Sequence, residues 1–115
     1  MITLYEYRAI IRTCYDGDTV RADIDLGFGI WKFNEPLRLF GINAPEMRNE
    51  TIIAGRMSRD RLRQRIQGRT VFIRTHKDAR DKFGRYLVEI WDPEHVNQWM
   101  VEQGLAVSFM DGSDG

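Results

Sequence analysis

The sequence contains a short polar turn whose residue types could bind a hard cation. Asp16 and Asp18 flank Gly17 in the segment DGDT (residues 16–19), between two stretches with the pattern of β-strands. Two carboxylates two residues apart can present oxygen ligands to an ion such as Ca²⁺. Asp and Gly are also standard turn residues, so taken alone this segment is more simply explained as a polar hairpin turn.

A second segment, RLFGINAPE at residues 38–46, combines an arginine and a glutamate across a predicted kink. Arg38 lies within an otherwise apolar strand and needs a partner there, either a carboxylate or a phosphate. The structural alternative is an ion pair with a glutamate. A third segment, DKFGR at residues 81–85, places Arg85 at the start of a strand; alone, it is an ordinary hairpin loop.

These three segments and a fourth occur in an order that resembles the staphylococcal nuclease family. The fourth is V-N-x-x-x-V-x-x-G-L-A at residues 96–106, and the similarity extends from residue 8 to residue 106. The resemblance implies an OB-fold barrel that cleaves phosphodiester bonds of DNA or RNA with Ca²⁺. It implies that Asp18 binds the metal, that Arg38 and Arg85 hold the scissile phosphate, and that Glu46 activates or orients water. It also indicates Lys82 and Phe83 as substrate contacts.

Phosphodiester hydrolysis requires these residue types. The transition state gathers charge on the phosphate oxygens, and guanidinium groups and a divalent ion stabilise that charge more than they stabilise the ground state. Arginine suits this task because its planar fork matches two phosphate oxygens and stays protonated. A carboxylate can accept the proton of the attacking water or orient it, and the residues leave both roles open for Glu46.

The sequence departs from the family pattern at the metal ligands. Asn43 replaces an aspartate, so a formal charge is lost and we expect weaker calcium binding. Ala44 replaces a threonine that offers its backbone carbonyl, a change that a backbone ligand tolerates. Asp16 is a candidate to compensate for Asn43.

The segment after Ala106 also differs, because the family's stacking tyrosines and C-terminal third helix have no counterpart. Phe83 and Phe109 are both candidates to stack on a base, with a core position preferred for Phe109. The barrel surface left uncovered could be closed by self-association, by another partner, or locally by Trp99, Phe109 and Met110.

The patterning predicts the elements that must position these residues. Alternating and β-branched stretches predict strands at residues 7–14, 20–26, 30–42, 70–76 and 85–91, with Pro36 at an edge, bulge or break. A helix is predicted at 50–67, with the stripe Ile52, Gly55, Arg59, Leu62 and Ile66, and ends at Gly68. A second begins between Pro93 and Val96, capped by Asp92, and stops at Gly104. Together with the resemblance, the pattern predicts a mainly β, α+β domain: a five-stranded Greek-key OB-fold barrel with two helices and no third helix.

Length and composition limit the class of protein. The 115 residues suit one domain, expected at 1–110 with a flexible tail at 111–115. No stretch resembles a signal peptide or a membrane span, and the single Cys14 cannot form an internal disulfide, so a cytoplasmic setting is expected. His76 and His95 lack metal-ligand spacing, which argues against zinc.

The zero net charge conceals a strong segregation of charge. Residues 56–85 carry 11 basic and 3 acidic side chains, and residues 86–115 carry 6 acidic and no basic ones. Because salt screens charges beyond a short distance, the zero net charge does not exclude a nucleic-acid partner for the basic segment 56–85. The alternative is that these basic side chains form a solvated helix face.

Three functions follow as alternatives. The first is a calcium-dependent nuclease. The second is an inactive or weakly active nuclease-like domain that binds nucleic acid or a protein, suggested by Asn43 and Ala44. The third is a structural subunit that uses the acidic end against a basic partner.

Overall fold

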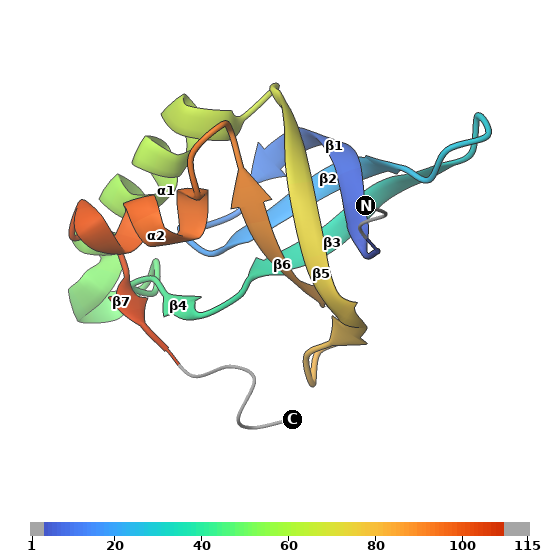
Figure 1. The fold of residues 1–115 in the computed structure, drawn as a ribbon. Helices are drawn as coiled ribbons and strands as arrows, with labels where there is room; N and C mark the ends of the chain where they lie inside the picture. Colours follow the sequence, from blue (N-terminus) through green and yellow to red (C-terminus); the bar gives the residue numbers. More distant parts are fainter. Residues whose placement is uncertain (1–3, 110–115) are drawn as a thin grey trace.

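Five strands close into a barrel, and two helices cover one side of it (Figure 1). The computed structural model describes residues 4–109. The barrel strands are β1 (Glu6–Cys14), β2 (Thr19–Asp25), β3 (Trp31–Leu39), β5 (Thr70–Arg80) and β6 (Tyr86–Trp91). Their order is β1-β2-β3-β6-β5, with β3 and β6 parallel and the other neighbours antiparallel. The predicted α+β class and five-stranded barrel are confirmed.

The predicted third strand, at residues 30–42, is wrong in its extent. β3 ends at Leu39, and Gly41 adopts a positive φ of 82°, a conformation that glycine tolerates best. The chain then forms β4 (Ile42–Asn43), which pairs with β7 (Val107–Ser108) outside the barrel. Pro36 lies in β3 just before this strand begins to pair with β6, in agreement with an edge position.

The first helix is shorter than predicted and buries a slightly different face. A 3-10 turn, η1 (Asn49–Thr51), precedes α1 (Ile52–Ile66), whose buried residues are Gly55, Ser58, Leu62 and Ile66. Ser58 is buried where the stripe predicted Arg59, because its hydroxyl donates a hydrogen bond of 2.7 Å to the carbonyl of Leu105. Gly68 follows the helix with a φ of 82°, as predicted.

The second helix, α2 (Val96–Glu102), begins later than a cap at Asp92 would allow. His95 is its N-cap residue, and the Asp92 carboxylate accepts hydrogen bonds from Arg69 instead, so the predicted cap is wrong. The buried Asn97 fixes α2 to the barrel. It accepts a hydrogen bond from the amide of Ile90 and donates to two backbone carbonyls, that of Phe40 just after β3 at 2.8 Å and that of Val88 in β6 at 3.1 Å.

The core lies inside the barrel and between the barrel and the helices. Its largest fully buried side chains come from every barrel strand and from both helices: Ile11, Val20, Leu37, Leu39, Leu62, Ile66, Val71, Ile73, Val88, Ile90, Val96 and Met100. Neither helix in the described part of the chain is long and apolar enough to cross a membrane. Met110 and the predicted tail at 111–115 lie outside the described residues.

Candidate active site

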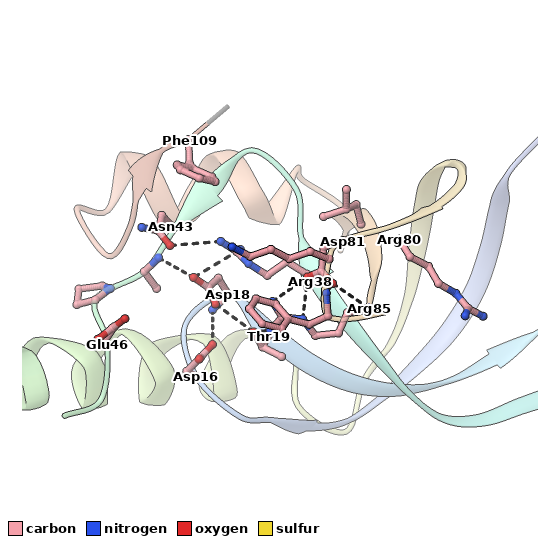
Figure 2. A pocket seen from close by; sticks show the side chains of 15 residues that line it. Asp16, Asp18, Thr19, Arg38, Asn43, Glu46, Arg80, Asp81, Arg85 and Phe109 are labelled. Carbon is pink, nitrogen blue, oxygen red and sulfur yellow. Dashed lines mark hydrogen bonds and ion pairs between the residues drawn. The ribbon is translucent and has the colours of Figure 1, made fainter. Parts of the chain in front are cut away.

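One end of the barrel carries a cleft of about 420 Å³ (Figure 2). Its walls come from the β1–β2 turn, from the segment between the end of β3 and residue 46, from the β5–β6 hairpin and from the residue after β7. Nine residues that the sequence predicts for the site line it: Asp16, Asp18, Arg38, Asn43, Ala44, Glu46, Lys82, Phe83 and Arg85. The fold therefore brings the separate motifs to one place.

The buried partner of Arg38 is Asp18 rather than a glutamate. Both side chains are about nine-tenths buried, and Asp18 Oδ2 lies 3.5 Å from Arg38 Nη1. The same oxygen accepts a hydrogen bond of 2.8 Å from the amide of Ala44. Arg38 also donates to the carbonyl of Leu39 at 2.8 Å and to the side-chain oxygen of Asn43 at 3.3 Å. These contacts fix the guanidinium and compensate its charge within a buried site.

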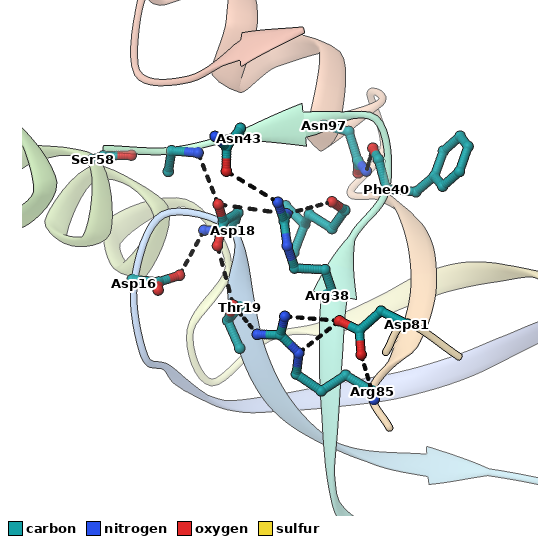
Figure 3. A network of polar contacts seen from close by, with 12 residues as sticks. Asp16, Asp18, Thr19, Arg38, Phe40, Asn43, Ser58, Asp81, Arg85 and Asn97 are labelled. Atoms are coloured by element: carbon teal, nitrogen blue, oxygen red, sulfur yellow. Dashed lines mark hydrogen bonds and ion pairs between the residues drawn. The ribbon is translucent and has the colours of Figure 1, made fainter. Parts of the chain in front are cut away.

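A chain of polar contacts connects the two predicted phosphate-binding arginines (Figure 3). Arg85 donates to the hydroxyl of Thr19 at 3.2 Å, and that hydroxyl donates to Asp18 Oδ1 at 3.1 Å. On its other side, Arg85 is held by Asp81, whose Oδ2 accepts a hydrogen bond of 2.8 Å from Nε. The arginines are thus oriented before any substrate arrives, which reduces the cost of ordering them in a reaction.

Asp16 lies next to Asp18 and increases the acidic character of the turn. Its Oδ1 accepts a hydrogen bond of 3.0 Å from the amide of Asp18. Burial, and then the neighbouring Asp18 carboxylate, raise the pKa of Asp16 to about 6. The turn packs closely on α1, since a Cβ at Gly17 would lie 2.0 Å from Ser58 Oγ. Glycine is required here by this close approach.

Glu46 is the most exposed of the predicted catalytic groups. Its side chain is 68% exposed and pairs with Arg48, with 2.9 Å between Oε2 and Nε. Its backbone is fixed, because its carbonyl accepts a hydrogen bond of 2.7 Å from Thr51 Oγ1 and packs against Gly55. The backbone of Glu46 is thus anchored, whereas its side chain is held, among the described residues, by an exposed ion pair alone.

Aromatic side chains lie at the edge of the cleft. The ring of Phe83 is 71% exposed and lies between two cations, 5.3 Å from Lys82 Nζ and 5.4 Å from Arg85 Cζ. Phe109 also lines the cleft and is 42% exposed, so its predicted core position is wrong. The amide of Phe109 bonds to the carbonyl of Gly41 as β7 leaves β4, which places the ring near Asn43 (Figure 2).

Sequence reasoning missed three polar residues of the cleft, Thr19, Arg80 and Asp81. Asp81 lies four residues before Arg85 in the DKFGR turn, and this spacing could have indicated the pair. Thr19 carries no such signal, because its role depends on a hydrogen bond from the distant Arg85. Arg80 carries none either, because the predicted strand ends at residue 76, whereas β5 extends to Arg80.

The polar side chains of the turn and of Asn43 supply oxygen donors of the types that a hard cation prefers. Within residues 4–109, no three His, Cys, Asp or Glu side chains are grouped to hold a metal by themselves. Asp18 and the amide oxygen of Asn43 meet at Arg38, and Asp16 adds a second carboxylate to the turn. Carboxylate and amide oxygens are ligands that Ca²⁺ accepts.

Comparison with known proteins agrees with this arrangement. A sequence profile described as "Staphylococcal nuclease homologue" matches residues 36–114, more than half of the chain. Two proteins, from Escherichia coli O157:H7 and from Escherichia coli, are each described as "Uncharacterized endonuclease". Both are 36% identical to this chain over 72 residues, which cover 61% of this chain and 44% of each relative. The chain thus spans less than half the length of these relatives. It belongs to the staphylococcal nuclease family.

Proposed function

We propose that this chain is a nuclease that hydrolyses phosphodiester bonds of DNA or RNA in a Ca²⁺-dependent reaction within the cleft. The observation that carries the proposal is the polar connection from Arg85 through Thr19 and Asp18 to Arg38. It joins residues from three separate segments of the chain around one cleft. The name of the curated relatives, endonuclease, is consistent with this activity.

The two arginines would bind and stabilise the reacting phosphate. Each retains its orientation through a carboxylate, Asp18 for Arg38 and Asp81 for Arg85. The N–H groups that these contacts leave over would then donate to phosphate oxygens as negative charge increases on them in the transition state. Because the fork of each guanidinium is fixed beforehand, little reorganisation accompanies the chemical step.

Glu46 would hold the attacking water and accept or direct its proton. Its exposed carboxylate lines the cleft but is paired with Arg48. Exposed ion pairs are worth about 0–1 kcal/mol, so a substrate can displace Arg48 at small cost. Catalytic hydrogen bonds commonly tighten only in the substrate complex, which fits the open position of Glu46.

Asp18, Asn43, the backbone carbonyl of Ala44 and Asp16 would hold the cation. When bound, Ca²⁺ supplies positive charge beside the scissile phosphate. Lys82 and Phe83 would contact the adjoining nucleotide, with Phe83 as a stacking surface. Base-independent contacts of this kind predict little sequence preference.

The test is cleavage of single-stranded DNA and plasmid by the purified chain. We expect cleavage with Ca²⁺, none with a chelator, and a loss of at least about 100-fold in Glu46→Gln and Arg38→Ala. Glu50→Gln, which removes an exposed carboxylate four residues from Glu46, is the control and should remain active. Absence of calcium-dependent, Glu46-sensitive cleavage would overturn the proposal.

A second candidate is a nucleic-acid-binding domain with disabled chemistry. It is favoured by Asn43 in place of a charged ligand and by the pairing of Glu46 with Arg48. Binding of DNA that weakens steeply with salt, without cleavage under any divalent cation, would support this second function.

A further inference from the structure

Arg80 differs from the other two arginines of the cleft because no carboxylate within residues 4–109 pairs with it directly. The hydrogen bond to Tyr86 and, more weakly, the charge of the more distant Glu35 raise the pKa of its guanidinium. Arg38 pairs with Asp18, and Arg85 pairs with Asp81. Arg80 also lines the cleft, but in the described part of the chain no carboxylate lies within ion-pairing distance of its guanidinium. A cation at the edge of a cleft without a directly paired carboxylate is suited to an anionic ligand.

Tyr86 holds the Arg80 side chain. Arg80 Nη2 donates a hydrogen bond of 2.6 Å to the hydroxyl of Tyr86, and the guanidinium carbon lies 4.5 Å from the centre of the Tyr86 ring. The two residues are partners across β5 and β6, so the backbone pairing sets their contact. The ring contact covers one face of the guanidinium and the hydrogen bond uses one N–H of Nη2, so the remaining N–H groups are available to a ligand.

Arg80 lies at a distance from the predicted reacting phosphate. Figure 2 shows its side chain directed away from Arg85 and at the opposite end of the site from Glu46. It cannot therefore share one phosphate with Arg38 and Arg85 in the orientation shown. It extends the positive charge of the cleft beyond Arg85, at the end of β5.

We propose that Arg80, oriented by Tyr86, binds a second phosphate of the nucleic acid, one that neighbours the phosphate at Arg38 and Arg85. This inference rests on the proposed function and adds a substrate subsite to it. Contacts to neighbouring phosphates position a strand without reading its bases. The consequence is a preference for oligonucleotides over a minimal diester that carries a single phosphate.

The experiment compares two substrates, the p-nitrophenyl diester of thymidine 5′-phosphate and a ten-residue oligothymidylate. We expect Arg80→Gln to raise KM for the oligonucleotide about fivefold, with kcat unchanged, and to leave both constants for the minimal diester as in the wild type. Tyr86→Phe keeps the ring and loses the hydroxyl, and should raise the oligonucleotide KM about twofold. Arg8→Gln removes an exposed arginine outside the cleft lining and is the matched control.

Binding of the oligonucleotide, followed by fluorescence anisotropy with Glu46→Gln as the parent, gives a readout that does not require cleavage. Adding Arg80→Gln should reduce the slope of log affinity against log salt by about 0.7, the value for one phosphate contact on a single strand. Circular dichroism melts check that each variant is folded.

An unchanged oligonucleotide KM and an unchanged salt slope in Arg80→Gln would overturn the inference. An equal loss of kcat/KM on both substrates would also overturn it, because Arg80 would then act at the reacting phosphate. In either case cleavage by the wild type would leave the proposed function standing. If the wild type cleaves neither substrate, the proposed function fails, and the salt slope still decides whether Arg80 contacts a phosphate.

Discussion

Asp81 holds Arg85 with both of its carboxylate oxygens. Oδ2 lies 2.8 Å from Nε and 2.7 Å from Nη2 of Arg85, while Oδ1 accepts the backbone amides of Arg85 at 3.0 Å and Phe83 at 2.9 Å. One side chain thus shapes the β5–β6 hairpin and aims the guanidinium that the hairpin carries. Both oxygens of Asp81 are engaged by Arg85 and the hairpin amides, so its expected role is to position Arg85.

Asp81→Asn should lower kcat about tenfold while the protein remains folded. The amide replaces one acceptor oxygen by a donor and removes the negative charge, so Arg85 loses its bidentate partner and its fixed direction. Steady-state kinetics on single-stranded DNA measure the effect. Glu102→Gln, an exposed site on α2, is the control, and equal activity of the two variants would contradict the role of Asp81.

The Asp81–Arg85 pair should also stabilise the fold above acidic pH. Burial by itself would raise the pKa of Asp81, but hydrogen bonds from the backbone and side chain of Arg85 and the Phe83 amide outweigh it and hold the pKa below its usual range. A pKa lower in the folded than in the unfolded state means stability present above the ordinary pKa of about 3.9 and lost as the pH falls below it. Urea unfolding should therefore give Asp81→Asn a lower free energy of unfolding than the wild type at pH 7, and this difference should shrink towards pH 3. A difference in the free energy of unfolding that does not change with pH would refute the link between the Asp81 pKa and stability.

Asn43→Asp should increase calcium affinity about tenfold, because a charged ligand replaces a neutral one near Asp18. The new carboxylate would also face Arg38 Nη2, which now donates to the Asn43 amide oxygen at 3.3 Å. Isothermal titration of the chain with Ca²⁺ measures the change. Asn34→Asp on the β2–β3 hairpin adds the same charge outside the cleft lining, and an equal gain there would show only a general electrostatic effect.

Gly55→Ala should displace the backbone of Glu46, although Gly55 itself does not line the cleft. An added Cβ would lie 2.6 Å from the carbonyl oxygen of Glu46, and backbone on both sides must move to relieve the overlap. We expect about 1–3 kcal/mol of destabilisation and reduced cleavage. Thermal unfolding and kinetics follow both effects, with the neighbouring Ala54→Ser, at an exposed site, as the control. Wild-type stability in Gly55→Ala would show that the contact between α1 and the Glu46 segment is loose.

Cys14 should be unreactive in the folded protein. The side chain is fully buried, and burial raises the pKa of its thiol to about 12, so almost no thiolate exists near neutral pH. A disulfide reagent at pH 8 should modify Cys14 only as fast as the chain unfolds, and at once in denaturant. Rapid modification without denaturant would indicate local opening of the end of β1.

The sequence by itself determined the local features of this protein. Alternation of apolar residues located the barrel strands, and Gly68 and Gly104 ended the helices at the predicted positions, each with a positive φ. The four ordered motifs supplied the candidate residues of the site. Even the Asp81–Arg85 pair is local, since four residues separate the partners within one hairpin.

The tertiary structure decided which residues meet across distant segments. Asp18 and Arg38 become partners because β2 and β3 pair with Thr19 opposite Arg38. Phe109 enters the cleft because β7 pairs with β4, more than sixty positions away in the chain. Of the 11 basic residues in 56–85, only Arg80, Lys82 and Arg85 line the cleft, whereas Arg65 and Arg69 lie against Asp92. Periodicity reports the face and the type of an element, but not the register in which distant strands pair, which depends on how the whole barrel closes.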